Sequence, residues 1–500
     1  MNNPLKRLAG ESAIYGLSTI IARIVNFFFV PLYTRMLSPA DYGMATMFLA
    51  YIAILQVALT LGLETGCFRF AGKHEQAGKV FSNALATMAI VCSLFFISTA
   101  LFSNQLASFA GREGFGIAII YFGAIVAIDC FTAILFARLR YEHKAMKFAV
   151  FKTIKIVVEL SANLLLFFVM PAYFAKHTHS VLLHLISATP DFTYMLCAIF
   201  LSCLIAFLLL IPDILRTRFS FNAALWKQMM LYSLPLMIAG IPGVANDFID
   251  RVLFPYCIPK ELLWEEQLGI YQAGAKLAVL MILFVQLFRY AAEPFFFGEE
   301  KNKNAPKLYA EVMNHFTAFC MCIFLFVMFY IDGIGLFLGK DFRTGLNIVP
   351  VMLGANVLLG LTFNLSMWYK LSGKTQFALY ITSAGLLVTV LVNVLFMPRY
   401  GYHAAAWGHF FSYLLMAVLS ARMGAKHYPI PYNWTRVIAY IFVGAALYFT
   451  SIIVPFPNVW IKWTVCTILL VAYAAFWLRL EKLNLLNIIR PLIKNKQSNT

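Results

Sequence analysis

The sequence predicts an all-α polytopic membrane protein with fourteen transmembrane helices. Fourteen apolar stretches follow one another along 500 residues, of which 62% are hydrophobic and 12% are charged. A helix needs about 20 apolar residues to cross a bilayer core of roughly 30 Å, and these stretches have that length. Strands of a membrane barrel would be only about ten residues long, with alternating polar residues. We therefore expect the chain to act inside or across a membrane.

The predicted spans fall into two sets of six and a final pair. The first set covers Ser12–Met36, Tyr42–Gly66, Val80–Ser103, Phe115–Phe136, Phe148–Met170 and Thr193–Ile211. The second set covers Met229–Tyr256, Leu268–Arg289, Val312–Ile331, Thr344–Leu371, Gln376–Met397 and Ala404–Met423. The final pair is Val437–Val454 and Val459–Leu478. Because the first stretch has no small-residue cleavage site, we interpret it as a span and not as a signal peptide.

The basic residues predict which way the spans run. If the N-terminus is cytoplasmic, 28 of the 39 Lys and Arg residues fall in cytoplasmic segments and nine fall on the opposite side. Lys152 and Lys155 are counted among the cytoplasmic residues, whereas Arg23 and Lys276 lie within spans. This bias follows the positive-inside rule and places both termini in the cytoplasm. The same rule accounts for the net charge of +17, so nucleic-acid binding is not expected.

The chain contains an internal repeat of six spans. Asp41-Tyr-Gly43 opens the second span and Gln267-Leu-Gly269 opens the eighth, and residues 144–163 align with residues 374–393 without a gap. Six is even, so the two sets have the same orientation, as in parallel repeats related by an axis along the membrane normal. We expect an N-terminal six-helix bundle (1–220), a second bundle (221–428), and two extra helices with a basic cytoplasmic tail (429–500). A central cavity would separate the bundles.

Charged residues inside spans are the main candidates for function, because each costs about 2.5–3.5 kcal/mol at the bilayer centre. The basic ones are Arg23, Lys276 and Arg251, and the acidic ones are Asp247, Asp250, Glu64, Asp129, Glu159 and Glu293. They predict a cationic or mixed-charge lumen for an anionic group, with carboxylates available for a coupling ion. Alternatively, Asp247 and Arg251 form a structural ion pair across four residues, and Glu64 and Glu293 lie at the headgroup level.

Two further patterns concern motion and energy. Pro235 and Pro242 interrupt the seventh span, which predicts either a bending element of a transporter or a static kink. The nine cysteines form no metal-ligand pattern, and no P-loop occurs. We expect no metal and no cofactor, so transport would draw on an ion gradient, of H⁺ or Na⁺, or on the substrate gradient.

Several segments resemble bacterial polysaccharide and O-antigen flippases of the multidrug/oligosaccharidyl-lipid/polysaccharide exporter superfamily. Near the N-terminus they are Tyr15-Gly, Arg23, Pro31-Leu-Tyr-Thr-Arg35 and Leu37-Ser-Pro-x-Asp41-Tyr-Gly43. Later ones are Asp250-Arg251, Leu268-Gly-Ile-Tyr271, Arg289-Tyr-Ala-Ala-Glu-Pro294 and Pro398-Arg-Tyr-Gly401. The resemblance covers essentially the whole chain. It implies a V-shaped fold, similar to that of MATE transporters, with two pseudo-symmetric six-helix bundles and two C-terminal helices.

The resemblance also implies a function. Such proteins move undecaprenyl-diphosphate-linked oligosaccharide, an O-antigen or other polysaccharide repeat unit, across the bacterial inner membrane by ion-coupled alternating access. They are not enzymes, and their partners would be the lipid-linked substrate, membrane lipids and polysaccharide polymerase or assembly proteins. By this resemblance Arg23, Arg251 and Lys276 would contact the diphosphate or sugars, and Asp247 and Asp250 would couple the ion.

Three alternative functions remain. A multidrug or cation exporter of the same superfamily usually has twelve spans and an acidic cavity. A lipid II flippase has fourteen spans, but its arginine-rich signature in the first span is not evident here. A membrane polysaccharide polymerase or ligase would need a long periplasmic loop, and the longest predicted outer loop, residues 171–192, has about twenty residues.

Overall fold

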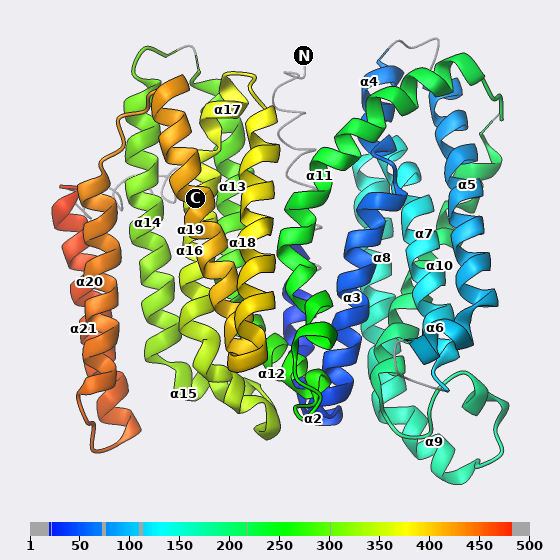
Figure 1. The fold of residues 1–500 in the computed structure, drawn as a ribbon, viewed down its shortest axis with the longest axis horizontal. Coiled ribbons are helices and arrows are strands. Elements are labelled where there is room, and N and C mark those ends of the chain that lie inside the picture. The colour runs from blue at the N-terminus through cyan, green and yellow to red at the C-terminus, as the bar shows by residue number, and fades with distance from the viewer. Residues whose placement is uncertain are drawn as a thin grey trace, which may run out of the picture. The chain divides into compact units, whose positions relative to one another are not determined.

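The computed structural model describes residues 20–21, 23–72, 77–109, 114–217, 219–300 and 302–482. These residues form helices and connecting segments, without a strand (Figure 1). Within them, 13 helical segments are long and apolar enough to cross a membrane. The first predicted span, Ser12–Met36, begins outside the described residues and is helical where it is described, ending in α2 (Val30–Met36). The polytopic all-helical prediction is confirmed, and the predicted basic tail after residue 482 lies outside the described part.

The helices follow the predicted spans closely. The first half of the chain contains α3 (Pro39–Leu59), α4 (Leu63–Ala71), α5 (Ala77–Leu101), α6 (Ser103–Phe109), α7 (Gly116–Tyr141), α8 (Ala145–Leu164), a π-helical turn (Leu165–Val169), α9 (Met170–Lys176), a 3₁₀ turn (Val181–His184) and α10 (Phe192–Leu215). The second half contains α11 (Ala223–Cys257), α12 (Trp264–Leu277), α13 (Val279–Gly298), α14 (Ala305–Phe329), α15 (Ile331–Ile334), 3₁₀ turns (Gly335–Phe337, Lys340–Ile348), α16 (Val349–Leu365), α17 (Met367–Leu371), α18 (Gln376–Tyr400), α19 (Tyr402–His427), α20 (Trp434–Ile453) and α21 (Val459–Leu480).

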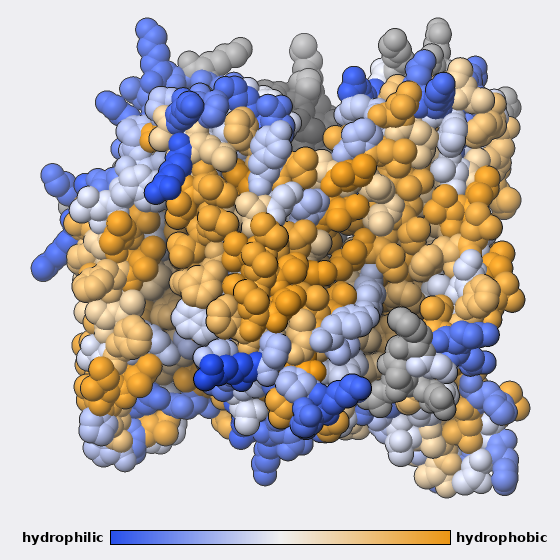
Figure 2. All heavy atoms as spheres, viewed as in Figure 1, coloured by the Kyte–Doolittle hydropathy of each residue, from blue (hydrophilic) through white to orange (hydrophobic). Residues whose placement is uncertain are grey.

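The described residues form two compact units. The first contains the chain up to Lys276 together with Leu338–Gly345 and Leu379–Ser412. The second contains Leu277–Phe337, Leu346–Ala378 and the chain from Tyr413. On the face drawn in Figure 2, hydrophobic residues predominate along the middle of the helices and hydrophilic residues gather toward their ends, as a lipid environment requires. The boundaries at residues 220 and 428 stay predictions.

The longest helix is α11, and it bends. Its 35 residues would span roughly 52 Å at 1.5 Å per residue, which is more than a bilayer core. Asn222 starts the helix, because its side-chain oxygen accepts a hydrogen bond from the Leu225 amide at 3.0 Å. Pro235 and Pro242 lie inside the helix and remove backbone hydrogen bonds. The resulting curvature is visible in Figure 1 and agrees with the predicted kink.

The predicted repeat has a side-chain counterpart. Asn163 on α8 and Asn393 on α18 occupy matching positions of the gapless alignment, and both are fully buried. Each amide donates to the backbone oxygen four residues earlier, Asn163 Nδ2 to Glu159 O at 2.8 Å and Asn393 Nδ2 to Thr389 O at 2.7 Å. A buried amide needs such a partner. A buried asparagine therefore donates the same hydrogen bond, to the backbone oxygen four residues earlier, in both sets of six helices.

Two glycines of the repeated motifs meet where α3 and α12 cross. A Cβ atom on Gly43 would overlap the backbone oxygen of Glu265 and lie 2.9 Å from the Gly269 nitrogen. Reciprocally, a Cβ on Gly269 would overlap the backbone oxygen of Pro39 and lie 3.1 Å from the Gly43 nitrogen. Only glycine allows two helix backbones to approach this closely. The motifs Asp41-Tyr-Gly43 and Gln267-Leu-Gly269 thus form the closest packing between these helices.

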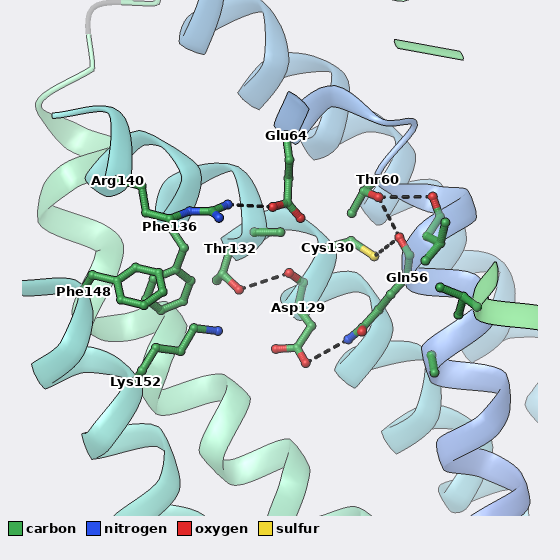
Figure 3. A pocket seen from close by; sticks show the side chains of 14 residues that line it. Gln56, Thr60, Glu64, Asp129, Cys130, Thr132, Phe136, Arg140, Phe148 and Lys152 are labelled. Atoms are coloured by element: carbon green, nitrogen blue, oxygen red, sulfur yellow. Dashed lines mark hydrogen bonds and ion pairs between the residues drawn. The ribbon is translucent and has the colours of Figure 1, made fainter. Parts of the chain in front are cut away.

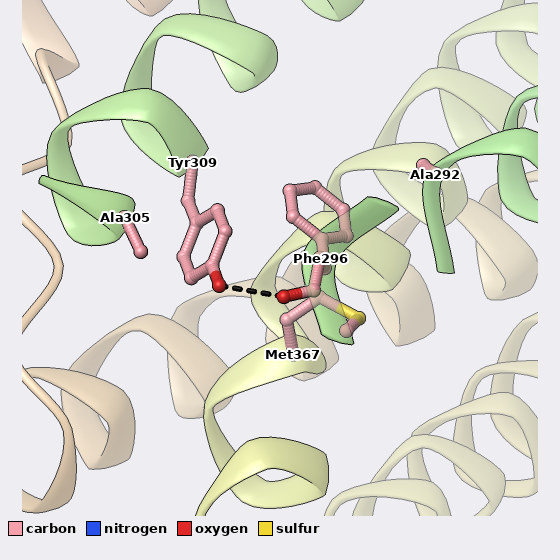
Figure 4. Packing of buried hydrophobic residues seen from close by; sticks show 5 residues of the cluster. All are labelled: Ala292, Phe296, Ala305, Tyr309 and Met367. Carbon is pink, nitrogen blue, oxygen red and sulfur yellow. Dashed lines mark hydrogen bonds between the residues drawn. The ribbon is translucent and has the colours of Figure 1, made fainter. Parts of the chain in front are cut away.

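In the second unit, a hydrophobic cluster joins α13, α14 and α17. It contains Ala292, Phe296, Ala305, Tyr309 and Met367 (Figure 4). The Tyr309 hydroxyl donates to the backbone oxygen of Phe296 at 2.7 Å, so the buried phenol is satisfied. The cluster fixes the part of α13 that carries Glu293, one of the predicted site residues.

Candidate functional site

Two of the basic residues predicted to contact substrate, Arg251 on α11 and Arg23, lie close enough to act electrostatically on the third, Lys276. Lys276 is half-buried and lies one residue before the end of α12. Because α13 begins after a single intervening residue, Lys276 lies close to the junction of these two helices. Like charges repel strongly where water is scarce. Such a cluster is suited to an anionic group that would relieve the repulsion.

The alternative that Asp247 and Arg251 form a structural ion pair stays a prediction. The Arg251 guanidinium carbon lies 4.7 Å from the centroid of the Phe248 ring. Arg251 Nε is buried without a hydrogen-bond partner among the described residues. Asp247 is exposed. The four-residue spacing permits the pair, and the Arg251 guanidinium also lies against its aromatic neighbour Phe248.

Asp250 has a partner from a distant helix. Its side chain is completely buried, and its Oδ2 lies 3.2 Å from Nε2 of His409 on α19, which is 5% exposed. Tyr271 on α12 and Arg251 also lie close enough to act on the Asp250 carboxylate. A buried carboxylate needs such partners to stay charged. Asp250 is therefore part of a polar site inside the first unit.

Uncharged polar residues continue this site along α11, α18 and α19. Asn246, one turn before Asp250, accepts hydrogen bonds at its Oδ1 from Thr389 Oγ1 at 2.7 Å and from Ser412 Oγ at 3.0 Å. All three side chains are buried. Ser412 Oγ is also 2.9 Å from the backbone oxygen of Gly385. The result is a polar seam, which we define as Asn246, Asp250, Thr389, His409 and Ser412.

A second polar region is a cavity of about 530 Å³ within the first unit (Figure 3). Its polar and aromatic lining comes from α3, α4, α7 and α8 and from Thr60, which directly follows α3. These residues are Gln56, Thr60, Glu64, Asp129, Cys130, Thr132, Phe136, Arg140, Phe148 and Lys152. Two of the predicted coupling carboxylates, Glu64 and Asp129, thus line one cavity. The Lys152 ammonium lies 4.2 Å from the centroid of the Phe136 ring.

The carboxylates at this cavity are already paired. Asp129 Oδ1 accepts from Lys155 Nζ at 2.6 Å, and its Oδ2 accepts from Gln56 Nε2 at 3.0 Å. Glu159, one turn after Lys155 on α8, is half-buried and acts electrostatically on both Lys155 and Asp129. A cation that bound at Asp129 would therefore compete with Lys155.

Glu64 and Glu293 form corresponding ion pairs in the two sets of helices. Glu64 accepts from Arg140 Nη2 at 2.9 Å in the first unit, and Glu293 accepts from Lys370 Nζ at 2.5 Å in the second. Arg140 and Lys370 occupy matching positions, because both lie four residues before the lysines that open the gapless alignment, Lys144 and Lys374. These contacts agree with a structural role near the ends of the spans.

Three charged or titratable residues of these sites were not recognised from the sequence. Lys152 and Lys155 were counted with the cytoplasmic residues, although both fall inside the predicted span Phe148–Met170, and they lie in α8, where Lys155 is ten residues after the start. Their spacing with Glu159, three and four residues, puts them on one helix face and could have indicated a buried cluster. His409 carries no local signal, because its partner is distant in the sequence.

The fold defines a multi-pass helical membrane protein. It is similar to the lipid II flippase MurJ in an inward closed conformation, with a TM-score of 0.72, 12% identity and coverage of 93% of this chain and 98% of that chain. It is also similar to a multidrug resistance MATE family transporter of the MOP superfamily in an inward-facing conformation, with a TM-score of 0.60, 13% identity and coverage of 86% and 96%. No curated protein sequence matches the chain.

The chain belongs to the family described as polysaccharide biosynthesis protein, whose match covers residues 8–297, more than half of the sequence. The resemblance inferred from the sequence motifs is therefore confirmed at the level of the family.

Proposed function

We propose that this protein is a flippase that moves an undecaprenyl-diphosphate-linked oligosaccharide across the bacterial inner membrane by ion-coupled alternating access. The observation that carries the proposal is that Lys276 lies within the electrostatic reach of two arginines, Arg251 and Arg23. A diphosphate is the anionic group of such a substrate, and paired guanidinium and ammonium groups bind phosphate oxygens strongly. Membership in a polysaccharide biosynthesis family supports a glycan as the cargo.

Each predicted residue has a place in this mechanism. Arg23, Arg251 and Lys276 contact the diphosphate or the first sugars. Asp247 and Asp250 couple the ion. Glu64, Asp129, Glu159 and Glu293 are further coupling candidates, but a coupling ion at Asp129, Glu64 or Glu293 would have to displace the basic partner that each already has. The seam carboxylate Asp250 is therefore favoured over Asp129, Glu64 and Glu293.

The remaining features of the proposal concern the cell. Both termini lie in the cytoplasm, as the distribution of basic residues predicts. The cargo is an O-antigen or another polysaccharide repeat unit, and polymerase or assembly proteins would receive it on the periplasmic side. The protein performs no covalent chemistry, since transport needs only binding and a change of access.

The test is a flipping assay in proteoliposomes that contain a fluorescent polyprenyl-diphosphate oligosaccharide. Arg251→Met and Lys276→Met remove charge and keep most of the side-chain volume, and Lys303→Met in the loop before α14 is the matched control. We expect the two cluster variants to lose flipping at normal protein levels and the control to keep it. Equal flipping in all three would refute the proposed role of the cluster. If the wild type transports cationic drugs and not the lipid, the exporter alternative is correct.

A further inference from the structure

The polar seam contains a titratable pair that the family match does not assign. We propose that Asp250 and His409 together form a proton-binding site, so that the coupling ion of this protein is H⁺. The inference rests on the proposed function and deepens it by naming the ion and adding His409 to the coupling machinery. It starts from the 3.2 Å separation of His409 Nε2 and Asp250 Oδ2.

The position of the pair favours proton binding. Asp250 lies seven residues before the end of α11 and His409 seven residues after the start of α19, so both lie within membrane-spanning segments. Asp250 is completely buried and His409 nearly so. An isolated charge is costly at such a place. A proton on the imidazole gives an aspartate–imidazolium pair, and its departure leaves Asp250 with Arg251 as the neighbouring positive charge.

Three helices bring neighbouring groups to the pair. On α11, Arg251 follows Asp250 directly and adds a permanent positive charge. On α12, the neighbour is the phenol of Tyr271. On α18, the seam residue Thr389 is uncharged. The imidazole of His409 is thus the group of this site whose ordinary titration range lies near neutral pH.

The ligands available at the seam favour H⁺ over Na⁺. Hard metal cations are held by several oxygen ligands at once. Here the atom next to Asp250 Oδ2 is an imidazole nitrogen, which is a poor ligand for such cations and a good proton acceptor. The nearby amide oxygen of Asn246 already accepts from Thr389 and Ser412. A sodium ion would have to break these hydrogen bonds, whereas a proton needs no further ligand.

Binding is linked to movement because the pair joins two helices. Asp250 is on the bent helix α11, and His409 reaches it from α19 across 159 residues of sequence. If α11 and α19 separate at this point during the transport cycle, the imidazolium loses its carboxylate and releases the proton more easily. The state of protonation then biases which arrangement of the helices is favoured.

The experiment compares ion gradients in proteoliposomes. Flipping of the fluorescent polyprenyl-diphosphate oligosaccharide is measured with a pH gradient, with a Na⁺ gradient and with neither. The variants are His409→Gln, which keeps a hydrogen-bond donor and does not titrate, and Asp250→Asn. His403→Gln, six residues earlier on the same helix, is the matched control. We expect the pH gradient to stimulate the wild type and the control, and this stimulation to be lost in both seam variants.

The outcomes separate the two proposals. Stimulation by Na⁺ alone, or an unchanged pH response in His409→Gln, overturns the proton site and leaves the flippase intact. If the wild type flips no lipid-linked glycan, the flippase proposal fails, and the site is then judged by NMR of ¹⁵N-histidine-labelled protein. We expect an imidazole signal that depends on pH, is absent from His409→Gln and shifts in Asp250→Asn. A His409 signal that does not titrate refutes the site.

Discussion

Replacing Gly43 by alanine tests whether the backbone crossing of α3 and α12 stabilises the fold. The added Cβ would overlap the backbone oxygen of Glu265, so at least one helix would have to move. A flexible side chain could turn away from the new methyl group, whereas a carbonyl within a hydrogen-bonded helix cannot. Gly269→Ala is the reciprocal change, directed at the backbone oxygen of Pro39.

The expected magnitude follows from two opposing effects. Overpacking of this kind costs typically 1–3 kcal/mol. Because the Glu265 carbonyl cannot turn away from the new methyl group, we expect a cost at the upper end of this range, about 3 kcal/mol. Alanine is better than glycine inside a helix by about 1 kcal/mol. We therefore expect Gly43→Ala to lower the free energy of unfolding by about 2 kcal/mol. Gly243 on α11 provides the control, because a Cβ there meets no atom within 4 Å, so only the helix preference remains.

The assay is unfolding of the purified protein by SDS in mixed micelles, followed by circular dichroism. Gly43→Ala and Gly269→Ala should each unfold at lower SDS fractions than the wild type, and Gly243→Ala should not. The double variant Gly43→Ala/Gly269→Ala should lose less unfolding free energy than the two single variants lose together, because one displacement of the helices relieves both overlaps. If Gly43→Ala is as stable as Gly243→Ala, the close approach contributes nothing and the reasoning is wrong.

Three further predictions use the same unfolding assay. Lys155→Met should destabilise the protein by about 1–3 kcal/mol by leaving Asp129 without its cation, and adding Asp129→Asn should recover part of the loss. Asn163→Ala should cost more than Asn393→Ala, because Asn163 Oδ1 also accepts from the Tyr33 hydroxyl at 3.0 Å; equal losses would contradict this. Burial raises the pKa of Glu142, but hydrogen bonds and charge from Lys144 and Arg138 outweigh it and hold the pKa below its usual value. The stability advantage over Glu142→Gln should therefore be present at neutral pH and disappear as the pH falls below about 4.

The helical architecture was predictable because it depends on local composition. Each span is an apolar stretch long enough to cross the membrane, so hydropathy alone places α5, α7 and α10 within a few residues. The repeat was also visible, because matching positions need similar residues. Asn163 and Asn393 show why, since both must satisfy a buried amide in the same way.

The site was only partly predictable, because its contacts are long-range. Local spacing suggested a pair between Asp247 and Arg251, yet the seam joins Asp250 to His409 across 159 residues. Nothing in the neighbourhood of His409 indicates that partner. Lys155 was counted as cytoplasmic because positive charge near a span end usually is, and only the three-dimensional structure shows it paired with Asp129.

The glycine crossing has a consequence for the sequence itself. Gly43 and Gly269 occupy matching places in the repeated motifs, and each lies against the other's helix. A position at such a crossing packs against its own counterpart, as in a symmetric dimer whose two copies happen to be joined in one chain. One steric requirement therefore restricts two sequence positions that lie more than 200 residues apart, Gly43 and Gly269. The two halves of the chain can diverge freely elsewhere, but here a larger residue in one half would be opposed by the other.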